Sequence, residues 1–185
     1  MDTYNQTLRN YFSNPANLDE PTNQIIAKIK SNKNVWIIGN GGSASTAEHF
    51  ATDLQLIKYP QIKQEIRAFA LTANSSILTA IANDIGYDEV FSHQLFRMAS
   101  SEDLCILISA SGNSENLIRA IGVCKQKKIS TLAILGFDGG KLKSLADAVI
   151  HFETESGFYA EVEDVHLSIC HQLSLKVRNH FLGMS

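Results

Sequence analysis

The sequence predicts an α/β fold in which five parallel strands form a doubly wound sheet with helices on both faces. Short apolar runs rich in β-branched residues carry this prediction, because nearly continuous apolar strands are typical of a parallel sheet covered on both sides. Four such runs are followed by helical patterns, which favours alternating strands and helices. They span residues 35–38, 104–108, 131–135 and 148–152, and a fifth strand is expected over 67–71.

Helices are expected between the strands wherever apolar residues recur at helical spacing. An amphipathic helix is expected at the start of the chain, outside the sheet, and the tail is expected to form one long helix. The three prolines of the chain all fall outside the predicted helices, as their missing N–H group requires. The expected helices span residues 3–12, 22–29, 43–57, 75–82, 90–98, 114–124 and 162–181.

Length and composition indicate one globular domain over residues 1–185, with N-terminal helices in 1–30 and the core in 31–185. The net charge of −3 provides no basic surface for nucleic acid. No apolar run approaches the ~20 residues that a membrane helix needs, and no signal-peptide pattern opens the chain, so we expect a cytoplasmic protein. The three cysteines are far apart in apolar stretches, which favours buried, reduced thiols.

Two glycine- and serine-rich loops follow predicted strands, at the edge where open parallel sheets bind ligands. Residues 39–45 match neither a Walker loop nor the dinucleotide-binding fingerprint, so spacing allows either a ligand loop or a tight turn with Ser43 as N-cap. Residues 109–116 place three serines where a strand meets a helix N-terminus. Free N–H groups form an anion site there, and three serines exceed what one cap needs, which favours phosphate over an ordinary turn.

Acidic and histidine side chains recur on two of the predicted helices. His49 and Asp53 are four residues apart and share a helix face. The last helix carries a second set, Glu163, Asp164, His166 and His171. Such side chains near ligand loops suit metal binding or proton transfer, whereas a lone helical histidine is usually structural, and spacing leaves both interpretations open.

Six separated motifs occur in the order and near-equal spacing of one known family. They are Gly39–Ser43; His49–Ala51; Ala82–Asp84 with Gly86 and Phe91–Ser92; Ser111–Ser114; Asp138–Lys141; and Glu163–Asp164 with His166 and His171. Over residues 25–180 the chain resembles the phosphoheptose isomerases, a family of sugar isomerase (SIS) domain proteins. The resemblance implies a flavodoxin-like SIS fold, a homotetramer with active sites shared between subunits, and one Zn²⁺ per subunit. It also implies aldose–ketose isomerisation of sedoheptulose 7-phosphate to D-glycero-D-manno-heptose 7-phosphate or a close relative, for lipopolysaccharide or capsule heptose synthesis.

The resemblance further implies a role for each matching position. Asp53 and His171 would be catalytic, and the metal ligands would be His49, Asp53, Glu163 and His171. The substrate would contact Asn40, Gly41, Gly42, Ser43, Asp84, Ser109, Ala110, Ser111, Ser114 and Glu163. The chain departs from the family at several of these positions: Asp53 replaces a glutamate, Glu163 a glutamine and Ala110 a threonine.

Helix geometry and the resemblance disagree about one metal ligand. Residues 163 and 171 lie roughly 80° apart around a helix, whereas 164 and 171 lie roughly 20° apart. Spacing alone therefore pairs Asp164 with His171, and the resemblance pairs Glu163 with it. We follow the resemblance and predict Glu163.

A non-catalytic role is the main alternative for the whole chain. The replication-initiator-associating protein is an SIS adaptor that shares the implied fold and tetramer. It has lost the histidine equivalent to His171, which this chain keeps. A phosphosugar-sensing regulator is a weaker alternative, because such regulators usually carry a helix-turn-helix domain that this sequence does not supply.

Overall fold

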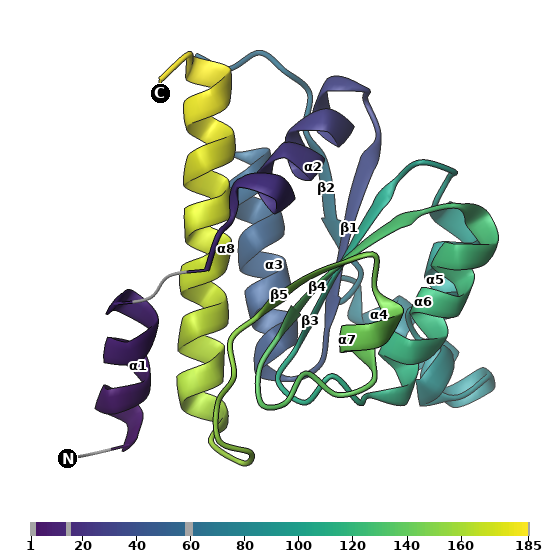
Figure 1. Ribbon diagram of the computed structural model, residues 1–185. Helices are drawn as coiled ribbons and strands as arrows, with labels where there is room; N and C mark the ends of the chain where they lie inside the picture. The colour runs from purple at the N-terminus through teal and green to yellow at the C-terminus, as the bar shows by residue number, and fades with distance from the viewer. Residues whose placement is uncertain (1–2, 14–15, 58–60, 185) are drawn as a thin grey trace.

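A five-stranded parallel sheet lies between two layers of helices in the computed structural model, which describes residues 3–13, 16–57 and 61–184 (Figure 1). The strand order is β2-β1-β3-β4-β5, the order of flavodoxin-like folds. The predicted doubly wound α/β fold is therefore confirmed, and each strand matches its predicted run to within one residue at either end. The strands are β1 (Asn34–Gly39), β2 (Arg67–Ala70), β3 (Leu104–Ser109), β4 (Ser130–Leu135) and β5 (Ala148–His151).

Successive residues of each strand face opposite helical layers, which is why the strands are apolar almost throughout. Ile37 pairs with Ile106, and both pack in the core under one layer. Their neighbours Ile38 and Leu107 also pair, and they pack in the core under the other layer. The sheet thus buries both faces of its strands in two separate apolar cores.

The two layers contain different helices, and they are positioned by the strand order (Figure 1). One core contains residues of α2 (Asp19–Lys30), α3 (Gly42–Gln55) and α8 (Tyr159–Leu182). The helix α1 (Thr3–Ser13) packs on α8 from outside. The opposite core contains residues of α4 (Ser75–Asp84), α5 (Ser92–Met98), α6 (Glu115–Lys127) and α7 (Leu142–Leu145). A 3-10 turn, η1 (Tyr87–Glu89), joins α4 to α5.

Several helix boundaries differ from the predictions by two or three residues, and two of these differences have clear local reasons. Pro21 lies inside α2, contrary to the expectation for all prolines, because α2 begins at Asp19. A proline is tolerated there, since N–H groups of the first turn have no intrahelical acceptor. The helix expected over 90–98 begins only at Ser92, because the 3-10 turn occupies the preceding residues. Within the described ranges, no helix combines the length and the apolar character needed to cross a bilayer.

Candidate active site

The strand order reverses between β1 and β3, and the two predicted ligand loops leave the sheet at this point. The loop after β1 leads to α3 on one face, and the loop after β3 leads to α6 on the other. Such a switch point opens a crevice at the carboxyl ends of the strands. A cavity of about 150 Å³ lies there, and it brings together most of the predicted substrate residues. It is lined by Asn40, Ser43, Ile108, Ser109, Ala110, Ser111, Ser114, Tyr159 and Glu163.

The serine loop is held in shape by its own side chains and by a second loop. Gly112 has a φ of 63°, and a Cβ there would lie 2.0 Å from the carbonyl oxygen of Gly139, so only glycine fits. The hydroxyl of Ser109 accepts the N–H of Gly112 at 3.0 Å. Asn113 Oδ1 accepts the N–H of Lys141 at 3.1 Å. The Asp138–Lys141 motif therefore supports the loop that lines the cavity.

The hydroxyl of Ser114 forms no hydrogen bond with the described residues. Ser114 occupies the N-cap position of α6, but its side chain caps none of the N–H groups described in that helix. Leu117 N–H donates to the carbonyl of Ser114 at 3.1 Å, whereas the N–H groups of Glu115 and Asn116 have no acceptor among the described residues. Together with the Ser114 hydroxyl, these two N–H groups are available to an anion. This arrangement fits the phosphate site that the three serines predict.

The glycine loop differs from its sequence interpretation in one detail. Gly41, with a φ of 56°, is the N-cap residue of α3, so Ser43 is not the cap. Ser43 instead lies in the first turn, buried and lining the cavity. A Cβ on Gly42 would lie 2.1 Å from Glu163 Oε1, so the missing side chain makes room for this carboxylate. Glu163 therefore lies at the N-terminus of α3, where a negative charge is favoured.

Three of the four predicted metal ligands meet at a second place, between α3 and α8. The Nε2 atoms of His49 and His171 lie 3.0 Å apart. Asp53 Oδ1 lies 3.6 Å from His49 Nε2, and Asp53 Oδ2 lies 3.8 Å from His171 Nε2. All three side chains are partly exposed, so solvent and small ligands can reach them. We call these three residues the histidine–aspartate cluster.

The donor atoms of this cluster suit a zinc ion. One ligand atom from each residue lies within 4.8 Å of the others. When two Nε2 atoms face each other at 3.0 Å, only one can carry the hydrogen between them, and a cation could accept both lone pairs instead. Two imidazoles and a carboxylate form a common catalytic zinc set that leaves a fourth position open. The residues present therefore fit the implied metal.

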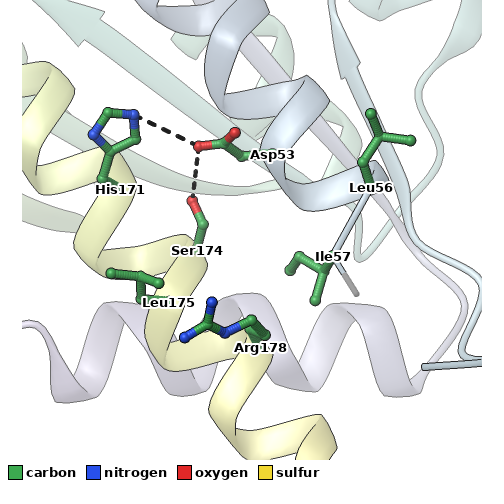
Figure 2. Close-up of a pocket in the computed structure, with 7 residues that line it drawn as sticks. All are labelled: Asp53, Leu56, Ile57, His171, Ser174, Leu175 and Arg178. Carbon is green, nitrogen blue, oxygen red and sulfur yellow. Dashed lines mark hydrogen bonds and ion pairs between the residues drawn. The ribbon is translucent and has the colours of Figure 1, made fainter. Parts of the chain in front are cut away.

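A cavity of about 460 Å³ adjoins the cluster along α8 (Figure 2). Ser174 lies one turn beyond His171, and its hydroxyl oxygen is 3.4 Å from Asp53 Oδ2. Leu56 and Leu175, both exposed, form apolar walls, and Arg178 lines the same hollow. Asp53 thus faces both His171 and Ser174 across the gap between the two helices, as Figure 2 shows.

Neither acidic residue considered as the fourth ligand belongs to the cluster within one chain. Glu163 is eight residues from His171, which is about 12 Å along a straight helix, and its carboxylate lies against Gly42. Asp164 accepts a hydrogen bond from the hydroxyl of Tyr4 on α1. Within one chain, the described residues therefore bring together three of the four predicted metal ligands, and Glu163 as the fourth ligand stays a prediction.

Comparison with known proteins decides the family. The SIS domain family matches residues 2–136, well over half of the chain. A phosphoheptose isomerase of Sulfurimonas denitrificans is 39% identical over 166 residues, which is 90% of this chain and 84% of that protein. A phosphoheptose isomerase from Helicobacter pylori is 36% identical over 164 residues, which is 89% of this chain and 84% of that protein. The chain belongs to the phosphoheptose isomerase family of SIS-domain proteins.

Solved structures of this family share the fold. A phosphoheptose isomerase from Neisseria gonorrhoeae superimposes with a TM-score of 0.81 at 29% identity, covering 94% of this chain and 92% of that one. A phosphoheptose isomerase from Francisella tularensis superimposes with a TM-score of 0.82 at 22% identity, covering 97% of this chain and 100% of that one. At this lower identity the comparison supports the shared fold and no more. Membership in the phosphoheptose isomerase family makes the chain an enzyme of the phosphosugar isomerase class. The adaptor alternative is therefore not supported.

Two residues remain to be placed within this phosphoheptose isomerase fold. Asp84, a predicted sugar contact, ends α4 and accepts a hydrogen bond of 2.8 Å from Asn83, but it does not line the serine cavity. Tyr159 does line the cavity, at the start of α8, and its ring contacts Phe137 with centroids 5.2 Å apart. Sequence reasoning missed Tyr159, because an exposed aromatic residue at a helix start has no distinctive pattern.

Proposed function

We propose that the chain interconverts sedoheptulose 7-phosphate and an aldose heptose 7-phosphate, D-glycero-D-manno-heptose 7-phosphate or a close relative. The single observation that carries the proposal is the meeting of His49, Asp53 and His171 in a fold with a serine-rich phosphate pocket. Family membership supports a heptose phosphate as the substrate. The direct test is to incubate the purified protein with sedoheptulose 7-phosphate and follow formation of the aldose by NMR. Failure to form any aldose would refute the proposal.

The proposed reaction moves one proton between C1 and C2 of the sugar through an enediol. A carboxylate within hydrogen-bond reach of both carbons can remove the proton from C1 and return it to C2. Asp53 is the proposed base, because its two oxygens face the two imidazoles and it is partly exposed. His171 would carry the accompanying proton between the oxygen atoms of C1 and C2, since one ring nitrogen of an imidazole can donate a proton while the other accepts one.

A zinc ion bound by His49, Asp53 and His171 would polarise the carbonyl oxygen of the sugar. The serine loop would hold the phosphate at the opposite end of the substrate. Binding energy from this distant group can orient the reacting carbons, which is why a phosphate pocket contributes to rate as well as affinity.

Substituting both Ser111 and Ser114 with alanine is expected to raise KM for the sugar phosphate by about tenfold to 100-fold, because each hydroxyl lost removes a donor to a charged group. The fold should survive, since even a lost helix cap costs only about 1 kcal/mol. Ser101→Ala is a matched control, because Ser101 precedes β3 at the opposite edge of the sheet. An unchanged KM in the double variant would remove the serines from the phosphate site.

We also propose that the active site is shared between chains of a homotetramer. Within one chain, Glu163 in the serine cavity and His171 in the cluster are about 12 Å apart along α8. This separation supports an approach of the predicted fourth ligand to the ion from a neighbouring copy. Exposed Leu56 and Leu175 beside the cluster offer apolar surface that such a neighbour would cover.

Light scattering at micromolar concentration is expected to give four times the chain mass of 20.4 kDa. Mixing the Ser111→Ala/Ser114→Ala protein with His171→Ala protein, after subunit exchange, should regain part of the lost activity. Recovery is expected because some shared sites would combine an intact pocket with an intact cluster. A monomer mass would contradict the tetramer. A tetramer without recovery would place the pocket and the cluster of each site in one chain.

A further inference from the structure

The side chain of Asn40 joins three segments of the chain at the edge of the serine cavity. Its Nδ2 donates to Asn116 Oδ1 at 2.9 Å, and Asn116 Nδ2 donates back to Asn40 Oδ1 at 2.9 Å. The hydroxyl of Tyr87 donates to the same Asn40 Oδ1, also at 2.9 Å. Asn40 itself lines the cavity with the serines, so this network touches the predicted ligand site.

Because Asn116 is buried, its side-chain amide must form its hydrogen bonds within the protein. Asn116 is only 2% exposed, and a buried amide that loses its hydrogen bonds is strongly disfavoured. Asn40 meets this demand through a reciprocal pair in which each amide donates once and accepts once. Within the described part of the chain, these bonds occupy both lone pairs of Asn40 Oδ1 and one amide hydrogen. The second amide hydrogen of Asn40 is left for a ligand oxygen.

The three segments come from different parts of the fold. Asn40 directly follows β1, and Asn116 lies in the first turn of α6, just after the serine loop. Tyr87 begins the 3-10 turn after Gly86, whose φ of 138° is a conformation that favours glycine. Tyr87 is 59% exposed, so little packing holds its side chain except the hydrogen bond to Asn40. The contact thus links the segment containing Asp84 to both ligand loops.

We propose that Asn116 and Tyr87 are positioning residues that hold the Asn40 carboxamide so that its remaining N–H meets an oxygen of the bound sugar phosphate. Asn116 sets the plane of the amide through two hydrogen bonds, and Tyr87 adds a third from the segment between α4 and α5. Both act on the ligand only through Asn40. This inference rests on the proposed function for the identity of the ligand, and it adds two residues to the proposed site.

A double-mutant cycle on Tyr87 and Asn40 tests the route of action. Tyr87→Phe should weaken binding of sedoheptulose 7-phosphate by about threefold to tenfold, the usual range for one lost hydrogen bond. In the Asn40→Ala background the same change should have almost no further effect, because the group that Tyr87 orients is gone. Melting temperatures should match between Tyr87→Phe and the unmodified protein. The proposal is overturned if Tyr87→Phe weakens binding equally in the unmodified protein and in the Asn40→Ala variant. It is also overturned if Tyr87→Phe leaves the dissociation constant unchanged.

Asn116→Asp provides a second readout that a purely structural role would not change. A protonated carboxyl can donate to Asn40 Oδ1 and accept from Asn40 Nδ2, as the amide does, whereas an ionised carboxylate can only accept. The affinity of this variant, relative to the unmodified protein at each pH, should therefore fall as pH rises through the carboxyl pKa. Asn23→Asp, an exposed change on α2, should show no such pH dependence. A flat affinity ratio for Asn116→Asp would count against the proposal.

The two proposals fail in different ways. If the unmodified protein binds the sugar phosphate without isomerising it, the proposed reaction is refuted. The dissociation constants of the variants, each divided by that of the unmodified protein, would still test the roles of Asn116 and Tyr87. Absence of binding to the unmodified protein would overturn both. Normal turnover with unaltered ratios in the variants would overturn only the positioning role.

Discussion

His171→Ala is expected to lower kcat for heptose phosphate isomerisation by about 100-fold to 10,000-fold, the range for losing a positioned acid–base group. Removing His171 also leaves His49 facing an empty space where a second Nε2 atom had been 3.0 Å away. The two remaining cluster residues come from one helix and offer too few donors for a tight zinc site. Bound zinc should therefore fall together with activity, in protein purified without chelator and measured by elemental analysis.

Matched variants separate the cluster from its neighbours. Asp53→Asn should reproduce the loss of activity, because the amide cannot accept a proton. Glu48→Gln, an exposed change on the same helix, should leave metal and activity unaltered. Asp164→Ala should keep the metal, since its carboxylate is bound to Tyr4. Metal lost in Asp164→Ala but kept in Glu163→Ala would show that Glu163 is the wrong choice. Absence of metal from every sample, with full activity retained, would leave Asp53 and His171 as a plain acid–base pair.

The fold could be predicted from the sequence because its strands are buried on both faces. A residue such as Ile37 faces one core and its neighbour Ile38 faces the other, so the strand is apolar without interruption and stands out. The helix boundaries were harder to predict from the sequence. Gly41 is the N-cap residue of α3 with a φ of 56°, a conformation that favours glycine, and the close approach to Glu163 occurs at the next residue, Gly42.

The candidate site could be predicted in its parts but not in its assembly. The serines and the pair His49 and Asp53 are local patterns, and His171 joins the cluster because α8 packs against α3. The distance between Glu163 and His171 follows from the unbroken course of α8, which a sequence motif does not reveal. The pairing of Asn40 with Asn116 spans 76 residues and involves two polar side chains with no periodic signal. Only the register of neighbouring strands brings them together.

His166 was predicted as part of the acidic and histidine set on the last helix, but it lies inside the apolar core. Its side chain is 1% exposed, and neither ring nitrogen has a hydrogen-bond partner among the described residues. Burial lowers the pKa of His166 from 6.5 to about 4, because the charged imidazole would lose its hydration. The backbone of Leu135 lies close enough to the ring to oppose this shift in part, without reaching hydrogen-bond geometry, and the nearby His151 adds to the shift.

This shift predicts that the protein loses stability as pH falls from about 6.5 to about 4. Above pH 6.5 the imidazole is neutral in both states and contributes no pH dependence. Below pH 6.5, His166 binds a proton in the unfolded chain but stays neutral in the folded chain. The free energy of unfolding should therefore drop by about 3 kcal/mol between about pH 6.5 and about pH 4. Urea titrations of the unmodified protein and of His166→Leu, at equal concentration and several pH values, measure the difference.

The leucine variant should lose this part of the acid sensitivity and should be at least as stable at pH 7.5, because it replaces two unpartnered polar nitrogens with an apolar side chain of similar size. His180→Leu is the matched control, since His180 is exposed near the end of the same helix and should leave the acid profile unaltered. Parallel profiles for the unmodified protein and His166→Leu would show that His166 is not the group that titrates. A large loss of stability in His166→Leu at pH 7.5 would instead show that the ring nitrogens are bound to something in solution, such as an ordered water molecule, which a leucine cannot hold.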